Sequence, residues 1–166
     1  LHFMILCKIQ FKEEDTFFIA FVCAAEPTRD TDKPESTAGL TPDANKSVSP
    51  HFKVKEFHSR KDPCDNVIID PRLVDLLENV RRLTGKPVHI NSGYRSKEYN
   101  RTIKNASPKS QHCEGKAADI WIEGISPEKV AQYAECFLGA SGGIGIYHTF
   151  THVDVRSGMS RWKGAY

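Results

Sequence analysis

The sequence IGIYHTFTHVDV, residues 144–155, decides how the second half of the chain folds. Residues 144–147 and 150–155 alternate with the two-residue period of β-strands, and the two residues between them form a tight connection. The segment therefore predicts a β-hairpin. His152 and Asp154 are two residues apart on its second strand, so we expect their side chains to point to the same face of the sheet.

Helical and strand-like patterns alternate in the residues before this hairpin. Asp70 followed by Pro71 is typical of a helix start, and leucine and valine then recur on one helical face until Gly85 ends the pattern. Further elements are expected as strands over residues 88–91 and 117–122, a short helix over 97–104, and an amphipathic helix that opens at 126–128. Together these elements predict an α+β fold, with a small antiparallel sheet and helices packed on one side.

The length of 166 residues suits one domain with an extension. Patterned sequence is continuous over residues 50–166, which we predict as the domain. Residues 26–49 are rich in Pro, Thr, Ser, Asp and Lys and are expected to form a disordered linker. Residues 1–25 end in an apolar run that is too short to span a bilayer, and this segment is either an export signal or a leader unrelated to folding.

Composition and charge narrow the functional classes. The 23 Lys+Arg and 21 Asp+Glu residues give a net charge of +2, which argues against a protein whose main task is to neutralise nucleic-acid phosphates. The chain is 39% hydrophobic and 27% charged, as in soluble globular proteins. Its five cysteines are an odd number without a CxxC pair, so the sequence indicates neither a disulfide framework nor a zinc finger.

Three residues could share a metal ion. His112 precedes the predicted strand over residues 117–122, Asp119 lies on that strand, and His152 lies on the hairpin. Two imidazoles and one carboxylate can bind Zn²⁺ in tetrahedral geometry and leave one position open for water, as in catalytic zinc sites. Taken one at a time, the same residues could be a surface loop histidine, a capping carboxylate and a hydrogen-bonded strand histidine.

Two residues near His152 are candidates for proton transfer. Asp154 could act as a general base towards a metal-bound water, or it could orient the ring of His152 through a hydrogen bond. The sequence does not separate these two roles. His148, at the head of the hairpin, is the second candidate for a base.

Five segments carry a resemblance to a known family. They are SGYRS (92–96), SQHCEGKAADI (110–120), GGIGIY (142–147), FTHVDVR (150–156) and RW (161–162). Over residues 50–164 the chain resembles the zinc D-alanyl-D-alanine carboxypeptidase-like peptidases, which include vancomycin-resistance D,D-dipeptidases and phage L-alanyl-D-glutamate endolysins. The resemblance implies their small α+β zinc-peptidase fold, which the amino-terminal domain of hedgehog signalling proteins shares.

The resemblance also implies roles for individual residues. The family motif SxHxxxxxxD falls on Ser110, His112 and Asp119, which makes the histidine and the aspartate zinc ligands, and His152 is the third ligand. Arg95 matches the arginine that holds a substrate carboxylate, a task that suits a planar guanidinium able to bind a carboxylate through two hydrogen bonds. Ser110 is expected to help position the substrate.

The chain departs from the family pattern at one place. Many members carry a general base before the last ligand, as Glu-x-x-His or His-x-His, but Thr149 and Phe150 occupy those positions here. The carboxylate follows the ligand instead, as in the branch whose motif is HVD, so we predict Asp154 rather than His148 as the base. Tyr94, next to the predicted substrate arginine, either contacts the substrate or packs at the edge of the core.

The resemblance implies zinc-dependent hydrolysis of peptide bonds in peptidoglycan stem peptides, of the D-Ala-D-Ala carboxypeptidase or the endopeptidase type. The alternative is a zinc-containing module that binds the cell wall or a partner without turnover. A cell-wall substrate implies action in the periplasm or outside the cell, reached by export or with a phage lysis system. We expect a monomer that binds no nucleic acid and forms no stable membrane span.

Overall fold

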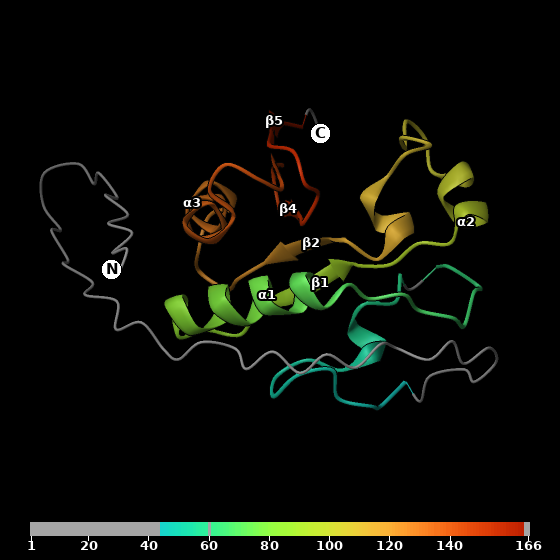
Figure 1. Ribbon diagram of the computed structural model, residues 1–166, viewed down its shortest axis with the longest axis horizontal. Helices are drawn as coiled ribbons and strands as arrows, with labels where there is room; N and C mark the ends of the chain where they lie inside the picture. The colour runs from blue at the N-terminus through green and yellow to red at the C-terminus, as the bar shows by residue number, and fades with distance from the viewer. Residues whose placement is uncertain (1–43, 60, 165–166) are drawn as a thin grey trace, which may run out of the picture. The chain divides into compact units, whose positions relative to one another are not determined.

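The computed structural model describes residues 44–59 and 61–164 (Figure 1). The predicted export signal or leader and most of the predicted linker lie outside the described residues. Within the described ranges, no helix combines the length and the apolar character needed to cross a membrane.

Residues 44–49, which end the predicted linker, make contacts with the domain. The backbone N–H of Val54 donates to the carbonyl oxygen of Lys46 at 3.0 Å. Val48 packs against the hydrophobic core. Contacts with the domain therefore begin before Pro50, the predicted start of the folded part.

A five-stranded sheet forms the centre of the fold (Figure 1). Its strands are β1 (His89–Ser92), β2 (Ala117–Trp121), β3 (Gly143–Ile146), β4 (Thr151–Asp154) and β5 (Ser160–Lys163). They are arranged in the order β1-β2-β4-β3-β5, and every neighbouring pair is antiparallel except β3 and β5, which are parallel. Strands β3 and β4 form the predicted hairpin.

Strand β5 is absent from the sequence-based prediction, and it changes the type of the sheet. Its sequence SRWK lacks the alternation of apolar and polar residues that marks a strand. After β4 the chain crosses the start of β3, where the N–H of Gly142 donates to the carbonyl of Arg156 and the N–H of Ser160 donates to the carbonyl of Gly142, each at 3.0 Å. The prediction of a purely antiparallel sheet is wrong because this crossing makes β5 parallel to β3.

Helices α1 (Pro71–Thr84) and α3 (Pro127–Leu138) have clear start and stop signals. The side chain of Asp70 accepts a backbone N–H of α1 at 3.0 Å, Ser126 caps α3 in the same way, and a proline follows each cap. Helix α1 ends at Gly85, whose φ of 64° is the left-handed conformation common after a helix. The sequence patterns therefore predicted both helices for the correct physical reasons.

The hydrophobic core lies between these two helices and one face of the sheet. Its buried members include Leu73, Leu77 and Val80 of α1, Val130 and Ala134 of α3, and Ala118, Ile120, Ile144 and Val153 of the sheet. Because side chains alternate along a strand, the residues between these core positions point to the opposite face. That face, which carries Asp119 and His152, is the one that α1 and α3 leave uncovered; we call it the ligand face.

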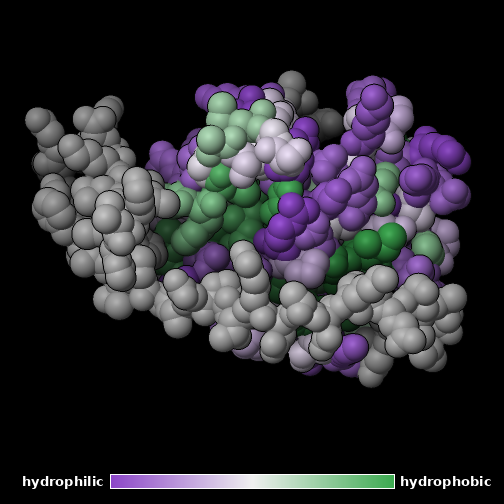
Figure 2. Space-filling view, viewed as in Figure 1, coloured by the Kyte–Doolittle hydropathy of each residue, from purple (hydrophilic) through white to green (hydrophobic). Residues whose placement is uncertain are grey.

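Three short elements lie in the connections between the strands and helices. They are η1 (Val54–Glu56), α2 (Lys97–Thr102) and η2 (Gln111–Glu114). In the space-filling view, hydrophilic side chains make up most of the described surface, with hydrophobic ones showing between them (Figure 2). The exposed large hydrophobic side chains of the described residues are Ile68, Trp121 and Met159.

Candidate metal centre

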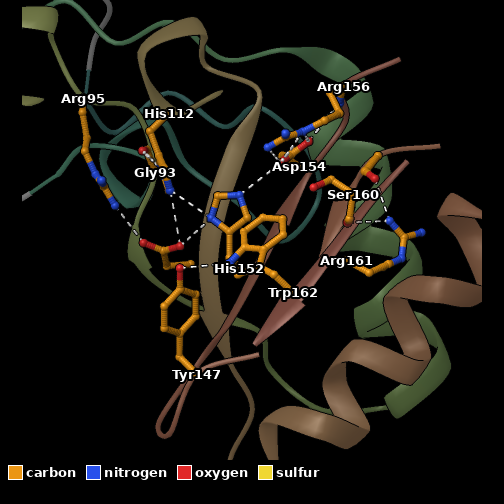
Figure 3. Close-up of polar contacts among 12 residues, drawn as sticks. Gly93, Arg95, His112, Tyr147, His152, Asp154, Arg156, Ser160, Arg161 and Trp162 are labelled. Atoms are coloured by element: carbon orange, nitrogen blue, oxygen red, sulfur yellow. Dashed lines mark hydrogen bonds and ion pairs between the residues drawn. The ribbon is translucent and has the colours of Figure 1, made fainter. Parts of the chain in front are cut away.

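Three side chains from separate elements converge on the ligand face (Figure 3). His112 lies in η2, Asp119 on β2 and His152 on β4, and the strand register places Asp119 directly beside His152. Nδ1 of His152 is 2.9 Å from Oδ1 of Asp119, while Nε2 of His112 is 3.3 Å from the same oxygen and 3.2 Å from Nδ1 of His152. All three residues are buried.

The spacing of these three atoms fits a tetrahedral metal ion. An ion that binds nitrogen and oxygen ligands at about 2.0–2.1 Å in this geometry holds neighbouring ligand atoms about 3.3 Å apart. Two imidazoles and one carboxylate also form a donor set that zinc accepts, and they leave a fourth position open. Among the described residues, this is the one group of three such side chains close enough to share an ion.

The backbone around His112 fixes the orientation of its ring. Nδ1 lies 2.6 Å from the carbonyl oxygen of Gly93, which can only accept a hydrogen bond, so Nδ1 carries the hydrogen and Nε2 presents a lone pair to the cluster. A side chain at Gly93 would collide with the backbone of Phe57. Glycine at this position therefore allows the chain that carries this carbonyl to pass close to the backbone of Phe57.

Arg95 donates a hydrogen bond to the second carboxylate oxygen of Asp119. Its Nη2 donates to Oδ2 of Asp119 at 2.8 Å, and its Nε donates to the hydroxyl of Ser92 at 3.0 Å. The Ser92 hydroxyl is in turn 2.9 Å from the hydroxyl of Ser59. The structure thus places Arg95 at the site, with two of its N–H groups bound to neighbouring side chains.

Asp154 lies on the other side of the His152 ring from the cluster (Figure 3). Its Oδ2 is 3.1 Å from Nε2 of His152, and Arg156 donates to both carboxylate oxygens, with distances of 2.5–3.0 Å. The residue is fully buried, and a side chain at Gly143 would collide with its carboxylate. These contacts favour the orienting role over the role of base, because both oxygens face Nε2 and Arg156 rather than the ligand atoms.

Burial and mutual contacts shift the pKa values of this cluster. Burial lowers the pKa of His112, which keeps its ring neutral. Burial alone would raise the pKa of Asp119, but the two histidines outweigh it and hold that pKa well below its usual range. Burial alone would lower the pKa of His152, but its hydrogen bonds to Asp119 and Asp154 raise it instead. Asp119 is therefore ionised at neutral pH and able to bind a cation.

The other predicted residues lie outside this cluster. Ser110 is half-buried and comes directly before η2. Tyr94 is also half-buried, and its backbone N–H donates to the carbonyl of Phe57 at 2.6 Å. His148 is exposed in the connection between β3 and β4.

Sequence reasoning missed the part that Trp162 plays at the site. Its ring centroid is 5.1 Å from that of His152, and its indole N–H donates to the hydroxyl of Tyr147 at 3.1 Å (Figure 3). The indole lies against Gly145 on β3, where any side chain would collide with it. Only the register of β5 could have revealed this contact, and the sequence of β5 does not predict a strand.

The supporting role of Arg156 was also missed. The arginine follows Asp154 by two residues, and its guanidinium lies 5.8 Å from the Trp162 ring. The spacing alone was a usable signal, because two residues apart on an extended chain place both side chains on one face. The same spacing also fits the solvated face of a half-buried strand.

Comparisons with known proteins identify the family of this chain. Residues 50–154 match the peptidase M15 family. The peptidoglycan L,D-endopeptidase MepK of Escherichia coli strain K12 is 38% identical over 94 residues, which are 52% of this chain and 50% of that protein. The probable peptidoglycan L,D-endopeptidase MepK of Haemophilus influenzae is 31% identical over 129 residues, which are 72% of this chain and 68% of that protein. The chain spans about half the length of the Escherichia coli relative.

The family match covers most of the described domain and includes all three residues of the cluster. It confirms the resemblance drawn from the five sequence segments. The chain therefore belongs to the peptidase M15 family.

Proposed function

We propose that this protein is a zinc-dependent peptidase that hydrolyses peptide bonds in bacterial peptidoglycan. The observation that carries the proposal is the convergence of His112, Asp119 and His152, whose ligand atoms lie 2.9–3.3 Å apart. The relatives named as peptidoglycan L,D-endopeptidases support the substrate class. They favour cleavage within stem peptides over removal of a terminal D-alanine. Such a substrate places the activity in the periplasm or outside the cell.

In this proposal His112, Asp119 and His152 hold the metal. Bound zinc supplies a Lewis acid and a water whose pKa is lowered to about 7. The protein contributes the orientation of the ligands: the Gly93 carbonyl fixes the ring of His112, and Asp154 fixes the ring of His152. Such outer contacts keep a ligand nitrogen aimed at the ion.

Arg95 is proposed to bind Asp119 and Ser92 and, at the same time, to bind the substrate. A guanidinium has five N–H donors, and the contacts with Ser92 and Asp119 use two of them. The others can bind a substrate carboxylate or stabilise the negative charge that develops on the attacked carbonyl oxygen. Tyr94 and Ser110 are proposed as further substrate contacts beside it.

Asp154 is proposed as a positioning residue rather than as the predicted general base. Its oxygens bind Nε2 of His152 and the guanidinium of Arg156, and the residue is fully buried. His148, the other candidate, is exposed in the connection between β3 and β4, outside the cluster.

A second candidate function is a zinc-containing module that binds the cell wall without cutting it. One observation favours it. Within the described part of the chain, the carboxylates that contact the cluster are Asp119, a ligand, and Asp154, which is enclosed. Thr149 and Phe150, at the family's usual base positions, cannot accept a proton.

Digestion of purified peptidoglycan sacculi separates the two functions. The protein is incubated with sacculi as isolated, after removal of metal by a chelator, and after zinc is restored, and released fragments are identified by mass spectrometry. A peptidase releases fragments with zinc and none without it, and the fragments identify the cleaved bond. Binding to sacculi with no release in any of the three conditions would instead establish the binding module.

Two variants control this experiment. His112→Ala removes a ligand and is expected to abolish release. His51→Ala removes an exposed histidine that contacts Glu78 on the surface, and it is expected to leave release unchanged. Equal activity of both variants would contradict the proposed metal centre.

A further inference from the structure

The ligand face of the sheet carries an aromatic pair next to the metal centre. Asp119 and Trp121 are two residues apart on β2, so both side chains point to this face about 7 Å apart along the strand. His89 lies opposite Trp121 on β1. The two rings are stacked, with centroids 4.2 Å apart and an interplanar angle of 19°.

This pair is more exposed than its position in the sheet would suggest. Strand β2 has a neighbour on each side, and four of its five residues are buried. Trp121 is nevertheless 38% exposed, and His89 is exposed as well. The two exposed rings together offer a continuous flat surface beside the metal centre.

A second stacked pair follows at the same end of the sheet. In the register of β2 and β4, Ile120 faces Thr151, so Trp121 and Phe150 come next along their strands at this end. The ring of Phe150 stacks on that of Tyr147, with centroids 4.5 Å apart and an interplanar angle of 13°. At this end of the sheet, aromatic rings from β1, β2 and the β3–β4 hairpin therefore lie next to the metal ligands.

We propose that the His89–Trp121 pair binds sugar rings of the peptidoglycan glycan strand while the attached stem peptide lies at the metal centre. This inference rests on the proposed function, which supplies the substrate class. Stem peptides are built from alanine, acidic and diamino acid residues, and none of these offers a broad flat apolar group to an aromatic ring. The sugars do, because one face of a pyranose ring presents only C–H groups.

The ring edges of His89 and Trp121 carry polar atoms that suit the polar substituents of a sugar. The imidazole nitrogens of His89 and the indole N–H of Trp121 can form hydrogen bonds with hydroxyl and acetamido groups. Aromatic rings with a polar edge are favoured wherever one side of a contact is apolar and the other is wet. Stacking on His89 also holds the indole in one orientation, which lowers the entropy lost on binding.

A comparison of two substrates tests this inference. The first is intact sacculi, and the second is the cross-linked stem peptide freed from glycan by an amidase. Trp121→Ala is expected to lower the rate on sacculi by about tenfold or more, as for a central aromatic contact, and to leave the rate on the free peptide within about twofold. Trp121→Phe keeps a ring and is expected to retain most of the activity on sacculi.

A binding measurement makes the test independent of catalysis. The probe is the tetramer of N-acetylglucosamine, with binding followed by NMR. The parent protein and Met159→Ala, which removes another exposed apolar side chain, are expected to bind the tetramer alike. Trp121→Ala is expected to weaken binding by about tenfold.

The outcomes separate failure of this inference from failure of the proposed function. Equal loss of rate on both substrates, or tetramer binding by Trp121→Ala equal to that of the parent, overturns the glycan site. If the parent cuts neither substrate, the proposed peptidase fails, and the tetramer measurement still decides the glycan site. A thermal unfolding curve for each variant shows that the compared proteins are folded.

Discussion

The two faces of the sheet in this protein use the same strands for different purposes. The face under α1 and α3 consists of apolar side chains such as Ile120 and Val153, which are held by packing. On the ligand face, polar side chains such as Asp119 and His152 are held by directed hydrogen bonds. Neighbouring residues on one strand therefore contribute either to stability or to the site, because alternation sends them to opposite faces.

The two faces should therefore respond differently to amino-acid substitution. Apolar packing tolerates substitutions that conserve volume, whereas a buried polar cluster fails when one partner is removed. Substitutions on the helix face should therefore lower stability and spare metal binding. Substitutions of the ligand residues should abolish metal binding, whatever their effect on stability.

The largest expected effect belongs to a ligand. Asp119→Ala is expected to lower metal affinity and hydrolysis by at least about a thousandfold, which corresponds to about 4 kcal/mol. Its removal also leaves Arg95 without its carboxylate partner. Metal content after dialysis and the rate on sacculi measure the effect. The contrast between the faces breaks down if the variant keeps its metal.

The second effect belongs to the helix face. Leu77 is completely buried in α1, so Leu77→Ala is expected to lower the free energy of unfolding by about 2–5 kcal/mol. Metal affinity of the folded fraction should not change. Urea unfolding and a chelator competition experiment at low urea measure the two quantities. A drop in affinity as large as the drop in stability would mean that the two faces are not independent.

A third, smaller effect concerns the support of His152. Arg156→Ala removes the donors that hold Asp154, and outer contacts of this kind are commonly worth about 10–100-fold in metal affinity. Arg156→Lys should recover part of the loss because it restores the charge but not the paired hydrogen bonds. Competition with a metal indicator measures affinity, with Arg101→Ala, an exposed arginine on α2, as the control. An unchanged affinity would show that Asp154 holds the ring unaided.

The smallest effect lies at the start of α1, away from the ligand face. The hydrogen bond with Arg72 lowers the pKa of the Asp70 carboxyl. A carboxyl with a lowered pKa in the folded state adds stability above its unfolded pKa of about 3.9, and this stability is lost as the pH falls through the folded value. Asp70→Ala should cost about 1 kcal/mol at pH 7 and less at pH 3.

Denaturant unfolding of the parent and of Asp70→Ala at both pH values tests this expectation. The difference in unfolding free energy should shrink at pH 3, while metal affinity at pH 7 stays the same. A difference that is equal at the two pH values would assign the loss to something other than the carboxylate.

The sequence could predict those parts of the protein that follow a local pattern. The caps and apolar spacing of α1 and α3, and the alternation of β3 and β4, are visible over a few residues. The resemblance to peptidases pointed to His112, Asp119 and His152, and these side chains do meet in the structure. Their shared location needed the register between β2 and β4, which no single segment contains.

The structural features that the sequence did not predict depend on contacts between segments that are distant in the chain. Strand β5 is defined by hydrogen bonds to β3 rather than by its own sequence. The bracing of Asp119 by Arg95, and the enclosure of Asp154 by Arg156, depend on the folded geometry of charged side chains. A charged residue in a sequence does not show which partner it will meet.

The position of Trp162 provides this site with an internal optical reporter. The chain contains two tryptophans, so Trp121→Phe leaves the indole beside His152 as the sole tryptophan emitter. A divalent ion that enters the cluster changes the charge next to this ring, and its fluorescence should change in step with occupancy. Loading and exchange of the ion could thus be followed in real time without an added dye.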